Sequence, residues 1–214
     1  MDSPSVNLYL LRHAESTLNA TGTHLIGGRS NEVELTREGV EQAKQLGRFL
    51  LSKNIQPDFI YSSPAVRTLA TAHHSLAEMN IDTHPIIDDN LQELDQGLKV
   101  GHNRTDVYTD EVLAAITTLG KDFKLEGGES MNDVGVRMLN AIATIADRHD
   151  TTNSTVTGLI YTHGLAIRCL ASTVHNWSHK QTYETEIPNA SINLFVRSSD
   201  QWNAHYVGLN TKQL

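Results

Sequence analysis

Five side chains that could take part in catalysis or binding follow segments whose patterns indicate buried strands. Arg12 and His13 come directly after the apolar run "VNLYLL", and His163 follows "TGLIYT". Arg67 lies just past "FIYSSP", and Glu93 comes after the shorter run "HPIID". In open α/β sheets, the loops beyond the carboxyl ends of the strands converge on one crevice. We therefore expect two arginines, two histidines and one carboxylate to meet at a single edge of a sheet.

These residue types together suit the transfer of a phosphoryl group. Guanidinium groups match phosphate oxygens through bidentate, charge-assisted hydrogen bonds. A neutral imidazole attacks phosphorus directly and forms a phosphohistidine. A second, protonated histidine would stabilise charge on the equatorial oxygens, and a protonated carboxylic acid would donate to the leaving oxygen. For Glu93, this acid role requires a bound phosphate dianion that offsets the neighbouring positive charges.

The elements that must position these groups alternate between strand and helix patterns along most of the chain. Short apolar segments indicate strands at 6–12, 58–63, 84–88 and 154–162, with two more joined around Ser198–Asp200. Apolar residues at helical spacing indicate helices at 35–52, 62–79, 105–119, 127–149 and 165–175. This order favours one α/β domain over residues 1–214, with a sheet covered by helices on both faces.

Capping residues mark where three of these helices begin. Thr36 is placed as an N-cap, and Ser130 with Asp133 three residues later forms an approximate capping box. Ser63 is a third candidate cap, because Pro64 suits the first helical position.

Composition and charge restrict the partners and the compartment. The 214 residues are 39% hydrophobic and carry a net charge of −8, which argues against nucleic-acid and membrane-surface binding. The negative net charge is compatible with binding of a small phosphorylated metabolite, provided that a local cluster of positive charge receives it. A homodimer is also possible. The N-terminus does not read as a signal peptide, and no apolar run is long enough to span a membrane. The single cysteine, Cys169, lies in an apolar helical pattern that indicates packing, and it suits a reducing cytoplasm.

The eleven histidines raise the question of metal binding. Only His175 and His179 stand at helical i, i+4 separation, and no nearby carboxylate completes a zinc motif. We expect both to be ordinary surface histidines. The chemistry above requires no metal and no other cofactor, because arginines and histidines supply the positive charge. It therefore predicts activity that is insensitive to EDTA.

Six segments of the chain resemble, in order, segments of one known family. "LRHAEST" resembles the "RHGE" signature of the histidine phosphatase superfamily, the phosphoglycerate mutase-like family. Further family segments are resembled by "LTREGVEQA", "YSSPAVRTLATA", "LQELDQG", "EGGES" and "YTHGLAIRCL". The resemblance covers most of the chain. It implies a three-layer α/β/α sandwich whose mixed, mostly parallel central sheet has about six strands.

The resemblance also implies roles for individual residues. His13 would be the phosphorylated nucleophile and Glu93 the proton donor. The implied remainder of the phosphate pocket is Arg12, Arg67 and His163, with Asn19 as a polar pocket residue and Gly164 letting the backbone approach the phosphate closely. Arg29 resembles a residue near the substrate entrance. For Asn19 and Arg29, an ordinary loop position remains an equal alternative.

The chain departs from the family pattern at several positions. Ala14 replaces the usual glycine and restricts the backbone, and Glu34 stands where proline is frequent. Lys99 and Val100 stand where many members have an aromatic residue and a glutamate. The change at Lys99 and Val100 puts substrate contacts in doubt but not the chemistry, and the roles of Lys99 and Arg29 in specificity stay open.

Three functions remain open within this resemblance. Mutases of the family usually have a longer segment between the acid-bearing segment and the "ES" helix start, whereas Glu93 and Glu129 are only 36 positions apart here. A missing cap would let water reach the phosphohistidine, which favours a metal-independent phosphatase of the histidine acid phosphatase type over a mutase. The third alternative is a catalytically inactive phosphoester-binding module. Glu129 itself is expected in the first turn of its helix, where the dipole favours an acidic residue.

Overall fold

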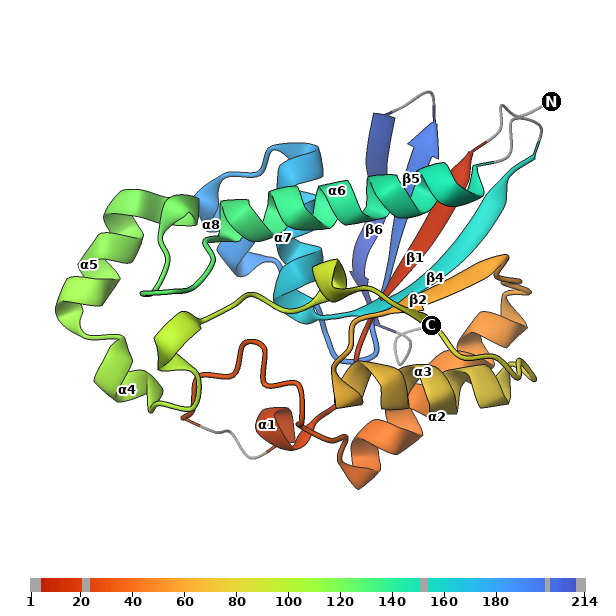
Figure 1. Ribbon diagram of the computed structural model, residues 1–214, viewed down its shortest axis with the longest axis horizontal. Coiled ribbons are helices and arrows are strands. Elements are labelled where there is room, and N and C mark those ends of the chain that lie inside the picture. The colour runs from red at the N-terminus through yellow and green to blue at the C-terminus, as the bar shows by residue number, and fades with distance from the viewer. Residues whose placement is uncertain (1–4, 21–23, 151–153, 199–200, 211–214) are drawn as a thin grey trace.

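The computed structural model describes residues 5–20, 24–150, 154–198 and 201–210, which form a mixed six-stranded sheet between two layers of helices (Figure 1). Along the sheet the strands are β3 (Ile86–Ile87), β2 (Phe59–Ser62), β4 (Val156–Thr162), β1 (Val6–Arg12), β5 (Ile192–Ser198) and β6 (Gln201–Leu209). Neighbours from β3 to β1 are parallel, whereas β5 is antiparallel to both β1 and β6. The expected three-layer fold with a mostly parallel sheet is confirmed.

The two helical layers take opposite faces of the sheet (Figure 1). Helices α2 (Arg37–Ser52) and α3 (Val66–Glu78) pack together on one face, and α6 (Met131–His149) and α7 (Gly164–His175) on the other. Alternate side chains of β1 serve the two cores: Leu8 and Leu10 join the cluster under α6 and α7, and Leu11 joins the cluster under α2 and α3. Burial on both faces explains why β1 reads as a nearly continuous apolar run.

The register of the central strands aligns three polar ends. Arg12 at the end of β1 pairs with Thr162 at the end of β4, and the His13 N–H continues the ladder by donating to the Thr162 carbonyl at 3.0 Å. On the other side of β4, the Ser63 N–H donates to the Tyr161 carbonyl at 2.9 Å. The residues that follow β1, β2 and β4 therefore leave the sheet side by side.

Two of the three predicted caps are confirmed. The Thr36 side chain accepts a hydrogen bond from the Gly39 N–H, and Ser130 with Asp133 forms the reciprocal capping box. The Ser63 cap is wrong: α3 begins at Val66, and its N-cap residue provides no side-chain hydrogen bond.

The connections are less regular than the sequence pattern indicates. The expected third strand shrinks to the two residues of β3, and two 3₁₀ turns follow, η1 (Asp89–Leu91) and η2 (Gly97–Lys99). Of the expected turn around Ser198–Asp200, residues 199 and 200 lie outside the described residues. A short helix, α1 (Thr17–Ala20), occupies the loop after β1.

The segment between η2 and α6 lies at one end of the molecule (Figure 1). The helix expected over 105–119 is divided into α4 (Arg104–Val107) and α5 (Asp110–Leu119), followed by η3 (Gly120–Asp122). The break occurs because Thr109 is extended and caps α5, its side chain accepting from the Val112 N–H. The short helix α8 (His179–Glu184) follows α7. Within the described ranges, no helix combines the length and the apolar character needed to cross a membrane.

Candidate active site

A cavity of about 200 Å³ opens at the carboxyl edge of the sheet. Its lining includes groups from the ends of β1 and α3, from the loop after β1 and from the segment after η1. The residues that line it are Arg12, His13, Ser16, Leu18, Asn19, Leu25, Gly27, Gly28, Arg67, Glu93 and Arg104. We call this cavity the phosphate pocket, after the role that the family resemblance implies for its residues. Four of the five residues first singled out line it, and the fifth, His163, contacts two of them.

His13 is held as a neutral imidazole with one nitrogen free for chemistry. Its Nδ1–H donates to the Ala14 carbonyl at 2.8 Å, and this tautomer leaves the lone pair on Nε2. Burial and then the neighbouring charges of Arg12 and Arg67 lower the pKa of His13 well below its usual value. The Ala14 N–H donates to Thr71 Oγ1 at 3.0 Å, and Ala14 is not among the residues with positive φ, so alanine fits here without strain.

His163 is also neutral, and its tautomer is fixed from both sides. Arg67 Nη2 lies 3.1 Å from His163 Nδ1, and because a guanidinium only donates, Nδ1 is the acceptor. The proton is then on Nε2, which donates to Ser63 Oγ at 2.8 Å. Burial, followed by the charge of Arg67, lowers the pKa of His163 well below its usual value. The expectation of a protonated second histidine is therefore wrong for this state. The two imidazole rings are 5.3 Å apart between centroids and inclined by 65°.

The two arginines of the pocket are anchored by backbone carbonyls. Arg67 donates to the carbonyls of Ser30 and Gly28, and Arg12 Nη1 donates to that of Ile187. Arg12 Nε is shielded from solvent and has no hydrogen-bond partner in the part of the chain that the structure describes. Burial lowers the pKa of both guanidinium groups.

Gly164 is required by the close approach of the Arg12 side chain. A Cβ at this position would lie 2.9 Å from Arg12 Nε. A side chain at position 164 is therefore excluded by Arg12, the arginine that would bind phosphate. A larger residue would displace that guanidinium.

Glu93 is the single acidic residue among the described residues that line the phosphate pocket. Its Oε1 accepts from the N–H groups of Leu94 and Ala166, both at 2.9 Å, and its Oε2 accepts from the Leu165 N–H at 3.1 Å. Leu165 and Ala166 belong to the first turn of α7, whose dipole favours a negative group at this end.

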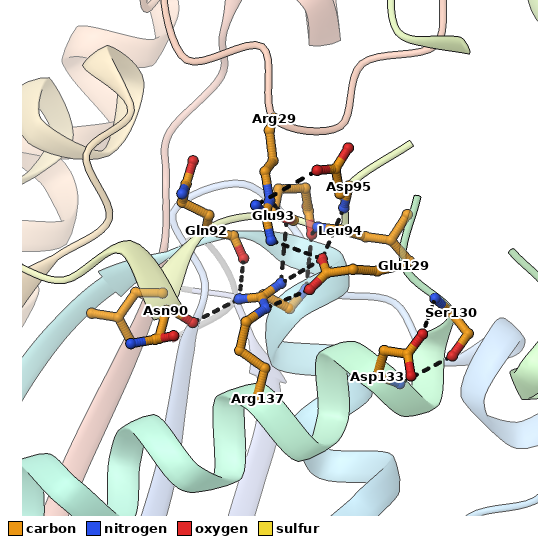
Figure 2. Close-up of polar contacts among 12 residues, drawn as sticks. Arg29, Asn90, Gln92, Glu93, Leu94, Asp95, Glu129, Ser130, Asp133 and Arg137 are labelled. Carbon is orange, nitrogen blue, oxygen red and sulfur yellow. Dashed lines mark hydrogen bonds and ion pairs between the residues drawn. The ribbon is translucent and has the colours of Figure 1, made fainter. Parts of the chain in front are cut away.

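A clamp of charged groups holds the irregular segment that carries Glu93 (Figure 2). Arg137 of α6 makes two parallel hydrogen bonds to Glu129, Nε to Oε1 at 2.7 Å and Nη2 to Oε2 at 2.9 Å. Its Nη1 donates to the carbonyls of Asn90 at 2.6 Å and Gln92 at 3.1 Å. Glu129 Oε2 also accepts from the Asp95 N–H at 3.0 Å. Glu129 precedes the N-cap of α6, so its expected place in the first helical turn is wrong.

Arg29 belongs to this clamp and does not line the phosphate pocket. Its Nη2 lies 3.1 Å from Glu129 Oε2, its Nη1 3.6 Å from Asp95 Oδ2, and its Nε donates to the Glu93 carbonyl at 3.3 Å. Lys99, at the end of η2, is likewise absent from the lining of the pocket. These two cations are thus kept apart from the groups gathered around His13.

Asn19 does line the pocket and holds its rim together. Its Oδ1 accepts from Ser16 Oγ at 3.0 Å and from Asn189 Nδ2 at 3.2 Å. Asn189 Nδ2 also donates to the His13 carbonyl at 3.1 Å. Asn19 therefore connects the loop after β1 to the segment before β5.

Sequence reasoning missed the roles of Ser63 and Arg137. The sequence pattern predicts Ser63 as a helix cap, whereas its hydroxyl fixes the His163 tautomer. Arg137 stands inside a regular amphipathic helix, where no local signal distinguishes it from other helical cations. Cys169 agrees with the packing interpretation: it is buried in the core, and burial raises the pKa of its thiol to about 12. Among the described residues, no cluster of three or more His, Cys, Asp or Glu side chains is arranged to hold a metal ion.

This fold and pocket define a class of α/β proteins in which a neutral histidine lies between arginines at the carboxyl edge of a mostly parallel sheet. The chain belongs to the histidine phosphatase superfamily (branch 1), whose family model matches residues 8–210. Phosphohistidine chemistry is general to this family.

Relatives and solved structures extend the likeness over nearly the whole chain. The probable phosphoglycerate mutase GpmB of Salmonella paratyphi C is 28% identical over 202 residues, which are 93% of this chain and 88% of that protein. The phosphoglycerate mutase of Bacillus anthracis has a TM-score of 0.81 at 23% identity, with 97% of this chain and 95% of that one covered. A mycobacterial glucosyl-3-phosphoglycerate phosphatase has a TM-score of 0.80 at 21% identity, with coverage of 96% and 100%.

Proposed function

We propose that this protein is a metal-independent phosphomonoester hydrolase that acts on small phosphorylated metabolites through a phosphohistidine at His13. The observation that carries the proposal is the state of His13: buried, neutral and with its Nε2 lone pair unprotonated beside two arginines. A neutral imidazole in a cationic pocket is the form that attacks a phosphate dianion. The reducing cytoplasm is the compartment that we propose, since the one cysteine is unpaired.

The proposed reaction has two displacements at phosphorus. His13 Nε2 bonds to phosphorus while the ester P–O bond breaks, and protonated Glu93 gives its proton to the leaving alkoxide. A water molecule then attacks the phosphohistidine, the P–N bond breaks, and Glu93 takes the proton that water releases. Arg12 and Arg67 stabilise the equatorial oxygens in both steps. His163 orients Arg67 through the Nδ1 contact.

Hydrolysis is favoured over transfer because the cover above the pocket is small. The 36 positions from Glu93 to Glu129 provide only the turns η2 and η3 and the short helices α4 and α5. A pocket with so little cover admits water to the phosphoenzyme, which then competes with a second substrate. The relatives named as mutases make phosphoryl transfer the second candidate.

Trapping the phosphoenzyme tests the proposal. Rapid acid-free quenching during turnover of a radiolabelled phosphoester should leave label on His13 that is stable in base and released in acid. His13→Ala should carry none, and its turnover should fall by at least roughly 10³-fold. Label on another residue, or full activity of the variant, would overturn the nucleophile.

The fate of the phosphoryl group separates the two candidates. Release of inorganic phosphate faster than any transfer between 2- and 3-phosphoglycerate supports the hydrolase, and the reverse order establishes the mutase. Activity should survive EDTA. Loss on chelation, with rescue by a divalent ion, would contradict the metal-independent mechanism.

A further inference from the structure

A second cavity, of about 290 Å³, adjoins the phosphate pocket. The two cavities share Arg104, and the neighbours Glu93 and Leu94 line one each. We call this cavity the annex. The lining residues that define it are Arg104, Tyr108, Phe123, Leu165, Arg168 and Tyr183. They come from α4 and the residue that follows it, from α7 and α8, and from the segment after η3.

Two of the four charged residues that line the annex already have partners. Glu129 is bound by Arg137 and Arg29, and Lys124 Nζ lies 3.5 Å from Asp133 Oδ2. Neither of these groups is free to meet a ligand without losing an existing ion pair. The unpaired charge of the annex is therefore held by the remaining two, which are both arginines.

Arg104 and Arg168 have no carboxylate within ion-pair distance in the described part of the chain. Arg168 Nε is shielded from solvent and has no hydrogen-bond partner there. Leaving a buried donor unsatisfied is destabilising, and more so when the donor is charged. Arg104 lies over the Tyr108 ring, with Cζ 5.3 Å from the centroid, a contact that orients the guanidinium but leaves its charge unneutralised.

The annex and the phosphate pocket form one electrostatic region. Arg168 is near enough to lower the pKa of Arg12, after the larger effect of burial. Three aromatic rings, those of Tyr108, Phe123 and Tyr183, line the annex, and an ion pair formed against such weakly polar groups is stronger than one in bulk water. An anion that entered here would meet two unpaired guanidinium groups while remaining next to the group bound at His13.

We propose that the annex binds a second anionic group, a carboxylate or a phosphate, on the alcohol part of the substrate, with Arg168 and Arg104 as its specificity-determining residues. This proposal rests on the proposed function, because it places the reacting phosphoryl group at His13. Substrates would then be phosphomonoesters whose leaving alcohol is itself anionic. The Nε–H of Arg168, unsatisfied in the free protein, would gain its partner from that group.

Matched substrate pairs test this directly. O-phosphoserine and O-phosphoethanolamine differ by one carboxylate, and 1,3-propanediol bisphosphate and 3-hydroxypropyl phosphate differ by one phosphate. In one pair the additional group is the anion that the annex binds. For that pair, wild-type kcat/KM should be roughly 10- to 100-fold higher for the member with this group. The pair with the larger ratio identifies the anion as carboxylate or phosphate.

Removing the proposed partner should abolish this preference selectively. Arg168→Met should bring the ratio close to one, while kcat/KM for the member without the anion and the inhibition constant of inorganic phosphate stay within about threefold of wild type. Arg168→Lys should restore part of the ratio. Lys180→Met is the matched control, since this cation is 81% exposed and pairs with Glu184 on α8, and it should leave the ratio unchanged. Should Arg168→Met not fold, Arg168→Gln, which also removes the charge, replaces it.

Two results would overturn the proposal: ratios near one for both pairs in the wild type, or an equal loss for both members of a pair in Arg168→Met. The second result would make Arg168 a purely structural residue. Calorimetric titration of His13→Ala with the same four compounds repeats the comparison without turnover. The proposal for the annex can therefore be wrong while the proposed hydrolase activity is correct. It can also be correct in a protein that binds phosphoesters but does not hydrolyse them.

Discussion

The phosphate pocket and the annex adjoin each other, yet the sequence builds them in opposite ways. The pocket collects residues that follow β1, β2 and β4, and the side chains of His13, His163 and Arg67 are each fixed by a hydrogen bond within the protein. The annex collects residues from short helices and connecting segments, and its Arg168 makes no such contact in the described residues. One cavity has its polar groups in place before a ligand arrives, and the other keeps two cations unpaired.

This difference teaches how the two tasks are divided. A nucleophile must be held in one tautomer and at one position, because a displacement of about 1 Å costs on the order of 100-fold in rate. Residues at the ends of adjacent strands meet that requirement, since the sheet register places them. Recognition of the leaving alcohol needs shape and charge that can vary between relatives, and loops or short helices on a rigid scaffold provide them.

Among the variants that compare the two cavities, the largest expected effect comes from Arg67, the cation that joins the two sides of the pocket. Arg67→Met removes a phosphate ligand and the donor that fixes the His163 tautomer, so kcat/KM should fall by roughly 10²- to 10³-fold for every substrate. Steady-state kinetics on both members of each matched pair measure this. Arg168→Met, by contrast, should affect only the anionic member of a pair. If Arg67→Met lowered kcat/KM only for the anionic members, the phosphate pocket and the annex would not have separate roles.

Glu93→Gln should produce a loss that depends on the leaving group. An alkoxide needs a proton as the ester bond breaks, whereas p-nitrophenolate does not. Turnover of alkyl phosphates should therefore fall by roughly 100-fold and that of p-nitrophenyl phosphate by less than about fivefold. The slope of log kcat against leaving-group pKa is the measurement. Equal losses on both substrate types would remove Glu93 from the role of acid.

The sequence predicts the fixed side of this comparison well, and for a physical reason. The sequence indicates where strands end, because apolar runs end abruptly there. Parallel neighbouring strands bring these ends to one edge of the sheet. This pattern predicts a shared site for Arg12, His13, Arg67 and Glu93, and all four line one cavity. The six strands, the Thr36 cap and the Ser130 capping box follow from equally local signals.

The rest depends on contacts that are distant in sequence. Ser63 and His163 are separated by 100 positions, and only the β2–β4 pairing brings the hydroxyl to the imidazole. Arg29 has the right charge for a substrate ligand, but Glu129 and Asp95 neutralise it from another part of the chain. Arg168 shows the converse case. A helical arginine is normally solvated or paired, and only the packed structure reveals that Arg168 has no hydrogen-bond partner for its Nε among the described residues.

The two neutral histidines at the pocket, His13 and His163, predict a stability that depends on pH. In the unfolded chain an imidazole has a pKa of about 6.5, whereas burial and nearby arginines hold the pKa values of His13 and His163 well below it. Below pH of about 6.5 the unfolded chain binds protons that the folded protein does not, so the free energy of unfolding should fall as pH decreases. Each histidine contributes about 1.4 kcal/mol per pH unit in that window and nothing above it.

Urea denaturation at pH 7.5 and 5.5 measures this dependence. In His13→Ala the difference between the two pH values should shrink by the share of one histidine, whatever the variant does to stability at either pH alone. The described residues that line the annex include no histidine, so Arg168→Met should keep the wild-type difference. An unchanged difference in His13→Ala would mean that this imidazole is not held neutral by the fold.

The smallest expected effects separate the two arginines that bind Glu129. Arg137 is 14% exposed and holds both Glu129 and the carbonyls of the segment before Glu93, so Arg137→Met should lower stability by about 3 kcal/mol. It should also slow alkyl phosphates roughly tenfold and spare p-nitrophenyl phosphate, because Glu93 would lose its position but His13 would not. A purely structural role would slow both substrates equally.

Arg29→Met provides the contrast. Arg29 is 29% exposed and adds only one ion pair to a Glu129 that Arg137 already binds through two hydrogen bonds, so kcat/KM should change by less than about threefold. The inhibition constant of inorganic phosphate should stay at the wild-type value in the same variant. A rise in that constant would mean that Arg29 leaves the clamp when phosphate binds. The pocket would then recruit a cation from outside its own lining, and its difference from the annex would be one of degree.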